Sequence, residues 1–164
     1  MKVLLVLLSC FQLSLVAGKS VNSGHAEVRL LTNLQSQRDE TFYLGIEMAM
    51  DKGWHTYWQN PGDSGGAFDV IWESPEGFII ENVSWPTPEL IPYPPLMTYG
   101  YEDYVLFPFQ VFRTAESNLG VVKATINFLI CADICVPESA SIEIDLSTEQ
   151  PSSLIADGIK SIPN

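Results

Sequence analysis

Two cysteines, Cys131 and Cys135, lie four positions apart in the segment "INFLICADICVPESASIEI". A pair of this kind can form a structural disulfide, hold a soft metal ion or exchange electrons as a dithiol. In one continuous β-strand their Cα atoms would lie about 13 Å apart, whereas a disulfide needs about 4.4–6.8 Å. A disulfide between them therefore requires the chain to reverse direction between the two residues.

The flanking residues favour a β-hairpin for this reversal. "TINFLI" and "SIEIDL" are β-rich, although one helical turn would also bring the sulfurs within range. In a hairpin, Ala132-Asp133-Ile134 forms a three-residue connection in which Asp133 supplies turn chemistry. A disulfide that closes about five residues stabilises a fold by roughly 2 kcal/mol. Such a bond can open without unfolding the domain, so the spacing favours redox chemistry and leaves a structural bridge as the alternative.

A metal site is the third alternative. Soft thiolate and thioether ligands would select Cu(I). The candidate ligands are Cys131, Cys135, His25, His55, Met48 and Met50. Two cysteines without a second pair are a weak indication, and alternating methionines in a strand usually belong to the core. We therefore expect no resident metal and no cofactor.

The segment Gly62-Asp63-Ser64-Gly65-Gly66 matches the residues around the nucleophile of trypsin-like serine proteases. Such a protease also needs a His base and a buried Asp from elsewhere in the fold. The upstream histidines are His25, near the start of the exported chain, and His55, close to Ser64 in sequence. The segment therefore predicts a glycine-rich turn and not a hydrolase site.

The composition indicates one globular domain that is exported. Of the 164 residues, 46% are hydrophobic and 17% charged, which excludes a disordered chain. The N-terminal "MKVLLVLLSCFQLSLVAGKS" has one basic residue, an apolar run and then small residues, which is the pattern of a signal peptide at residues 1–18. Its cleavage would remove Cys10 and leave an even number of cysteines, as suits an oxidising compartment such as the periplasm. A lipid-modified Cys10 is the alternative.

The formal net charge of −12 argues against nucleic acid or anionic lipid as a partner. A solvated acidic surface is the simplest interpretation of this charge, and a surface for a cationic partner is the alternative. After residue 18, no segment approaches the ~20 apolar residues that cross a bilayer, so we expect a chain that does not span a membrane.

Short segments with β-pattern alternate with turn residues along the exported chain. The predicted strands are Ala26–Leu31, Thr41–Met50, Trp54–Trp58, Phe68–Glu73, Phe78–Trp85, Val105–Phe112, Val121–Ile130 and Ser141–Leu146. They indicate an all-β antiparallel sandwich over residues 19–147. The proline-rich "SWPTPELIPYPPLMTYGYEDY" is predicted to be a long capping or binding loop. In the C-terminal tail, residues 148–164, a short helix is predicted at about Ser152–Ile159, with a frayed end as the alternative.

Three motifs in order resemble one family. "CADICVPESASIEI" resembles the active-site hairpin in the N-terminal periplasmic domain of the DsbD thiol:disulfide reductase family. "GWHTYWQNPGDSGGAFDVIW" is similar to an early strand and turn of the variant found in suppressor-of-copper-sensitivity proteins, and "WPTPELI" with "TYGYEDYVLFPFQV" resembles its loop and following strand. The resemblance covers about residues 26–146 and implies an immunoglobulin-like sandwich.

The family resemblance implies roles for particular residues. Cys135 would form a mixed disulfide with a partner, and Cys131 would resolve it. His55 and Tyr57 correspond to strand tyrosines beside the site in the reductase. The family shields its pair with a cap loop, whose aromatic residue falls near Thr98 and Tyr99 of "PPLMTYGYEDY"; Tyr101 is a further candidate cap residue.

The chemistry of the thiols follows from their neighbours in sequence. Asp133 and Glu138 are anionic and disfavour a second negative charge, and no Lys or Arg lies between Lys123 and Lys160. We therefore predict a poorly activated thiol.

The resemblance also implies partners. They would be thioredoxin-fold redox proteins and, because the sequence holds no membrane domain or Cys-x-x-Cys module, a separate membrane electron donor. Copper tolerance or cytochrome c maturation would be the process served, and the short loop between the cysteines favours the copper-tolerance variant. The alternative function is a non-catalytic sandwich that binds protein or copper and keeps its disulfide as a staple.

Overall fold

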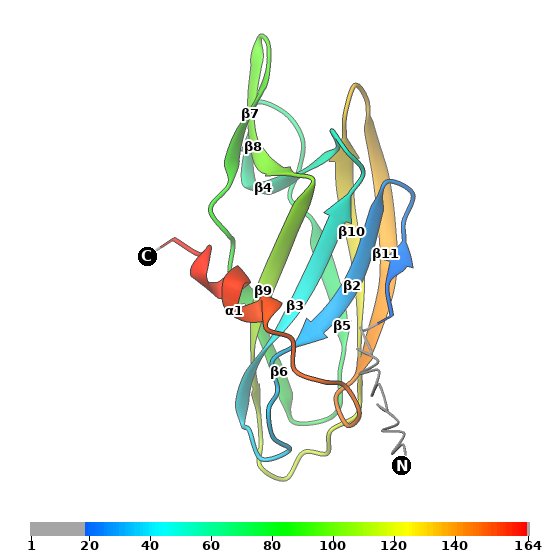
Figure 1. Cartoon of the computed structure of the whole chain (residues 1–164), viewed down its shortest axis with the longest axis vertical. Helices are drawn as coiled ribbons and strands as arrows, with labels where there is room; N and C mark the ends of the chain where they lie inside the picture. Colours follow the sequence, from blue (N-terminus) through cyan, green and yellow to red (C-terminus); the bar gives the residue numbers. More distant parts are fainter. Residues whose placement is uncertain (1–18, 164) are drawn as a thin grey trace, which may run out of the picture.

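The computed structural model describes residues 19–163, and the predicted signal peptide lies outside these residues. The described chain folds into two packed antiparallel sheets with one short helix (Figure 1). The elements are β1 (Val21–Asn22), β2 (Ala26–Thr32), β3 (Thr41–Met50), β4 (His55–Gly62), β5 (Asp69–Glu73), β6 (Phe78–Val83), β7 (Glu89–Tyr93), β8 (Leu96–Glu102), β9 (Tyr104–Arg113), β10 (Val121–Cys131), β11 (Cys135–Asp145) and α1 (Leu154–Lys160).

One sheet has the strand order β1-β2-β3-β9-β6, and the other has the order β11-β10-β4-β8-β7. On the side of β10 away from β11, two strands pair with it in succession: β5 pairs with residues 123–127, and β4 pairs at Cys131. The predicted all-β, immunoglobulin-like antiparallel sandwich is confirmed.

The core lies between the two sheets because apolar side chains alternate along the long strands. In β10, every second residue from Val122 to Ile130 is buried, and Met48 of β3 is fully buried in the same core. Met50 is also in this core, which agrees with a packing role for both methionines. The intervening side chains of β10 point to the outer face of their sheet.

The proline-rich segment is not a loop, so that prediction was wrong. Its residues form the β7–β8 hairpin, which turns at Pro94-Pro95, and Pro92 pairs with Met97. Strand β7 is the edge of its sheet, where a missing N–H donor can face away from the ladder. Figure 1 shows the tip of this hairpin and the tip of the β10–β11 hairpin at the same end of the sandwich.

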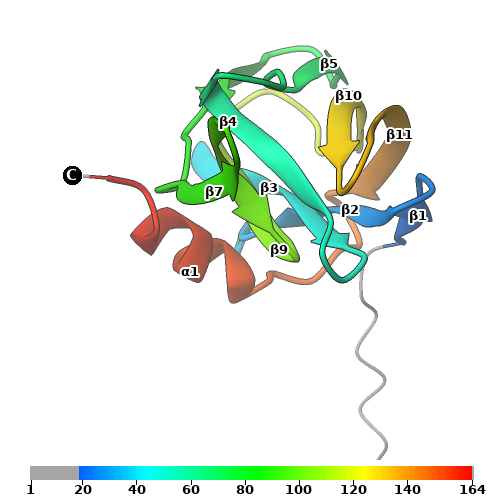
Figure 2. The ribbon, with the colours of Figure 1, turned by 90° about the horizontal axis from the view of Figure 1, so that it is seen from above.

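The C-terminal tail packs on the sandwich through α1, which lies against β9 and β3 (Figures 1 and 2). The predicted helix is confirmed. Its Ile155 is fully buried with Leu31 and Leu106, and Gly45 of β3 allows the close approach, since a Cβ there would lie 2.4 Å from the Cδ1 atom of Ile155. Among the described residues, no helix is both long and apolar enough to cross a bilayer.

Candidate redox site

The β10–β11 hairpin brings the two cysteines together. Its strands stay in register from Val121 opposite Asp145 to Cys131 opposite Cys135, and the two cysteines form a disulfide with Cα atoms 4.1 Å apart. The backbone N–H of Ala132 donates to the carbonyl of Ile134 at 3.0 Å across the tip. The hairpin predicted from the spacing is thus confirmed, and the helical turn is excluded.

The two sulfur-bearing residues differ in exposure. Cys131 is 2% exposed, whereas Cys135 is exposed at the start of β11. The tip residue Ile134, which precedes Cys135, is 67% exposed. A protein that approaches the disulfide from solvent therefore meets Cys135 and the apolar side chain beside it.

Tyr57 covers the disulfide from the neighbouring strand. Its hydroxyl lies 2.8 Å from Sγ of Cys131 and 3.3 Å from Sγ of Cys135. Because a disulfide carries no hydrogen, the Tyr57 hydroxyl is the donor in both contacts. Tyr57 is 1% exposed, and burial raises the pKa of its phenol, so the hydroxyl keeps its proton at neutral pH.

His55 lies on the same face of β4 as Tyr57 and pairs with Cys131 across the ladder. Its ring meets the ring of Tyr57 edge to face, with centroids 5.3 Å apart. Burial lowers the pKa of His55 below 6.5, and the negative charge of Glu102, directly opposite on β8, opposes this shift. His55 is therefore mainly uncharged at neutral pH and supplies no cation to a thiolate. Sequence reasoning did not find Glu102.

The two acids predicted to face the thiols lie in different surroundings. Asp133 is exposed at the hairpin tip. The carboxylate of Glu138 instead accepts hydrogen bonds from the Ser23 hydroxyl at 2.6 Å and the His25 backbone N–H at 3.0 Å. Side chains alternate along β11, so Glu138 points to the face opposite that of Cys135. Glu138 thus anchors the turn between β1 and β2.

Tyr101 belongs to the core, which corrects its assignment to the cap. It pairs with Thr56, the residue between His55 and Tyr57, and so points into the sandwich. Its hydroxyl donates to the Pro86 carbonyl at 2.8 Å, and burial raises the pKa of its phenol.

Thr98 and Tyr99, where the cap aromatic was expected, make other contacts. Thr98 is 2% exposed and donates its hydroxyl to the Ile91 carbonyl at 3.1 Å. Tyr99 is 41% exposed and packs edge to face on Trp58, with centroids 6.4 Å apart. In the described part of the chain, the side chain that hydrogen-bonds the sulfurs is Tyr57.

A groove of about 390 Å³ lies on the outer face of the β10–β11 hairpin, and its lining includes neither cysteine. Its floor includes Leu129 and Pro137, which form the pair two positions below Cys131 and Cys135 on the same face. One wall includes Asp69, which accepts a hydrogen bond from Asn127 at 2.9 Å. The groove therefore offers a surface of mixed polarity, with an acidic side chain in its wall, that begins two positions along the hairpin from the disulfide.

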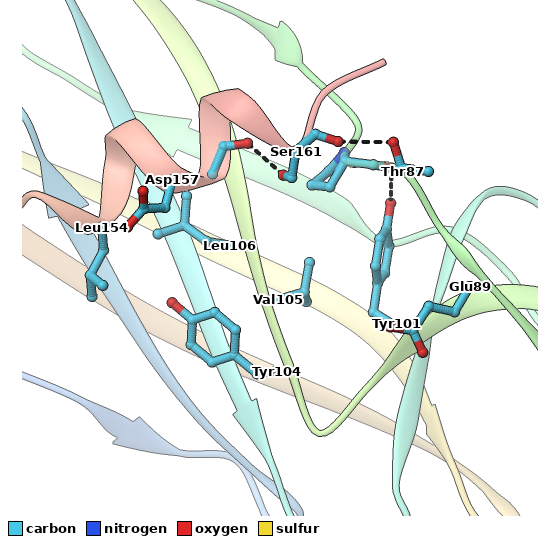
Figure 3. A pocket seen from close by; sticks show the side chains of 11 residues that line it. Thr87, Glu89, Tyr101, Tyr104, Val105, Leu106, Leu154, Asp157 and Ser161 are labelled. Carbon is cyan, nitrogen blue, oxygen red and sulfur yellow. Dashed lines mark hydrogen bonds between the residues drawn. The ribbon is translucent and has the colours of Figure 1, made fainter.

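A second cavity, of about 380 Å³, lies between α1 and the β8–β9 corner (Figure 3). Tyr104, Leu106, Leu154 and Asp157 are among its lining residues, and the lining includes neither cysteine. This cavity is separate from the redox site.

The candidate metal ligands do not converge. Within residues 19–163, no group of three or more His, Cys, Asp or Glu side chains is placed to hold a metal ion. His25 stacks on Trp54 with ring centroids 3.7 Å apart, and its Nδ1 lies 3.4 Å from a carboxylate oxygen of Asp51.

The fold and the site define this domain as an antiparallel β-sandwich that carries a disulfide at an exposed hairpin tip. Residues 27–146 match the family described as "Thiol:disulfide interchange protein DsbD, N-terminal". The match covers most of the sequence, so the chain belongs to this family, which confirms the resemblance found in the motifs.

One solved structure shares the fold. The N-terminal periplasmic domain of ScsB from Proteus mirabilis is 23% identical, with a TM-score of 0.68, and the match covers 88% of this chain and 58% of that chain. The chain thus spans little more than half the length of that crystallised protein. The GAE domain of yeast GGA1 is 14% identical with a TM-score of 0.39, covering 78% of this chain and 99% of that one. No curated protein matches the sequence.

Proposed function

We propose that this chain is a periplasmic thiol-disulfide exchange module that passes electrons through Cys131 and Cys135. Membership of the DsbD N-terminal family supports the chemistry. The observation that carries the proposal is the asymmetry of the disulfide: Cys135 is exposed, Cys131 is buried, and the Tyr57 hydroxyl contacts both sulfurs.

The reduction of the domain proceeds in two displacements. A thiolate of a reduced dithiol partner attacks the exposed Sγ of Cys135, the bond to Cys131 breaks, and the electron pair leaves on Sγ of Cys131, which then takes a proton. The partner's second thiolate then attacks the partner sulfur of the mixed disulfide and releases Cys135 as a thiolate, which takes a proton from solvent. The partner ends oxidised and the domain ends with two thiols. When the reduced domain passes its electrons on, Cys135 attacks the disulfide of a target protein, and Cys131 resolves the mixed disulfide.

Tyr57 assists at the buried sulfur. Negative charge develops on Sγ of Cys131 as the disulfide breaks, and a hydrogen bond to a charged acceptor is roughly twice as strong as one to a neutral acceptor. The Tyr57 hydroxyl, 2.8 Å away, is already in place to donate to that charge. Tyr57 therefore favours the transition state and the thiolate over the closed disulfide.

The reduced pair is expected to be weakly activated. His55 is uncharged at neutral pH, and the nearest acid in sequence, Asp133, carries charge of the wrong sign for a thiolate. We expect half-maximal alkylation of the reduced protein above pH 7. A value below about 7, the range of activated thiols, would contradict this account of the site.

The proposed partners are thioredoxin-fold redox proteins and a separate membrane electron donor, in a process of copper tolerance or cytochrome c maturation. The family supports the thioredoxin-fold partners. The groove over Leu129 and Pro137 supports an approach along the outer face of the hairpin, because this pair lies on the same face as the cysteines and only two positions from them.

A trapping experiment tests the proposal. A Cys131→Ser variant keeps the exposed sulfur and lacks the resolving one, so it should accumulate mixed disulfides with periplasmic proteins. The matched Cys135→Ser variant keeps only the buried sulfur and should trap little. The reduction potential of the intact pair should lie between roughly −270 and −120 mV; a value below about −300 mV would identify a structural bridge instead.

A further inference from the structure

The glycine-rich turn Gly62–Gly66, between β4 and β5, packs directly against Tyr57. A Cβ atom at Gly65 would lie 2.2 Å from Cε1 and 2.3 Å from Cζ of the Tyr57 ring. Gly65 also has φ +92°, a conformation that residues with a side chain rarely adopt. This position therefore requires glycine both for its backbone and for its contact with the ring.

Other groups complete the enclosure of Tyr57. Burial has the largest effect on the Tyr57 phenol and raises its pKa, whereas the Ser64 side chain lowers it. The His55 ring stands at 82° to the Tyr57 ring, and the two sulfurs lie at its hydroxyl. The turn thus limits the freedom of the ring that donates to the disulfide.

The turn is itself held by the β7–β8 hairpin. The backbone N–H of Asp63 donates to the Met97 carbonyl at 3.1 Å, and the Asp63 carboxylate accepts from the Met97 N–H at 2.9 Å. A Cβ at Gly62 would lie 2.7 Å from the same Met97 carbonyl oxygen. Met97 is 48% exposed, so the residue that fixes the turn is accessible from solvent.

We propose that the Gly62–Gly66 turn, anchored on Met97 through Asp63, is a positioning element that holds the Tyr57 hydroxyl on the two sulfurs and so sets the reactivity of the pair. The inference rests on the proposed exchange function. Ser64 and Gly65 are positioning residues, because they act through Tyr57 and not on the sulfurs.

Displacing the turn should weaken the donor. Weakening, without complete loss, of a hydrogen bond to a developing thiolate slows exchange by about 5- to 10-fold at neutral pH. The same loss moves the pH of half-maximal alkylation of the reduced pair upward. A change in packing alone would lower stability without moving this pH.

The test compares Gly65→Ala with Gly53→Ala. Gly53 has φ +82°, and no atom lies within 4 Å of the place that a Cβ would take there, so alanine brings a similar backbone strain without a clash. Gly65→Ala should slow reduction by dithiothreitol 5- to 10-fold, whereas Gly53→Ala should stay within about twofold of the natural protein. Equal rates for the two variants would overturn the proposal.

A double-mutant cycle identifies the route of the effect. In a Tyr57→Phe background, Gly65→Ala should lower the melting temperature further but leave the exchange rate and the alkylation profile unchanged. A further loss of rate in this background would show that the turn does not act through the hydroxyl. If Gly65→Ala does not fold, Ser64→Ala takes its place, with a smaller slowing expected; an unchanged rate and profile would again overturn the proposal.

A readout independent of exchange separates this inference from the proposed function. In the oxidised protein, Gly65→Ala should expose Tyr57 and bring its phenol pKa back towards 10, seen as a phenolate absorbance change that Tyr57→Phe abolishes. A reduction potential in the range of structural disulfides would refute the exchange function while leaving this titration to decide the role of the turn. An unchanged titration refutes the role of the turn even if the exchange function holds.

Discussion

Reduction of the disulfide between Cys131 and Cys135 should lower the free energy of unfolding by only about 2 kcal/mol. The cysteines are separated by 4 positions, and the chain-entropy relation for a loop of about five residues gives roughly 2 kcal/mol at 25 °C. The ladder from Val121–Asp145 to Ile130–Val136 and the buried inner face of β10 do not involve the sulfurs. The Tyr57 hydroxyl has a sulfur acceptor in both redox states.

Thermal unfolding followed by circular dichroism measures this quantity. For a domain of this size, about 2 kcal/mol corresponds to a decrease of roughly 4–8 °C in the unfolding midpoint. The protein would be melted with and without a reductant. The Cys131→Ser/Cys135→Ser double variant serves as the control, and the reductant should leave its midpoint unchanged.

A much larger effect would refute the reasoning. If the reduced protein unfolds at 25 °C, or loses more than about 4 kcal/mol, the disulfide is a structural staple. A domain that unfolds on reduction could not pass through its dithiol state in every exchange cycle. The proposed function would then lose its physical basis.

Three further predictions concern residues around the site. Burial lowers the pKa of His55 below its unfolded value of 6.5, so the contribution of neutral His55 to stability is complete above pH 6.5 and is lost as the pH falls towards the folded pKa. His55→Phe should therefore flatten the dependence of the melting temperature on pH between pH 5 and 7. A pH dependence equal to that of the natural protein would contradict this prediction. Tyr101→Phe leaves the Pro86 carbonyl without its donor and should cost about 1 kcal/mol in denaturant unfolding with no change in exchange rate; slower exchange would return Tyr101 to the cap. Asp69→Lys reverses the charge in the groove and should slow exchange with a trapped protein partner several-fold, whereas reduction by dithiothreitol, which does not occupy the groove, should stay within about twofold.

The sequence by itself determined the features that depend on neighbouring residues. Alternating apolar residues predicted the long strands, and the spacing of Cys131 and Cys135 required a reversal of the chain that β-rich flanks turn into a hairpin. The motifs around them identified the family. Strand period and turn geometry are set within a few residues, so sequence patterns report them directly.

Tertiary structure alone decided which side chains meet the sulfurs. The pairing of β4 with β8 places Tyr101 opposite Thr56 and therefore in the core, while Tyr57, one position further along β4, faces the disulfide. A shift of one residue in this register would exchange the two faces. Register depends on packing between strands far apart in the chain, and a sequence pattern with a period of two fits either face equally well.

The same reason explains the two segments whose place the sequence did not show. The proline-rich segment forms a hairpin because its first strand lies at a sheet edge, and a strand becomes an edge only when the whole sheet is assembled. The turn with Ser64 and Gly65 carries a strong local glycine pattern, but the Tyr57 ring that it contacts reaches the sulfurs only once β4 lies beside β10. Local chemistry thus set the disulfide and the turn, and long-range packing joined them into one site.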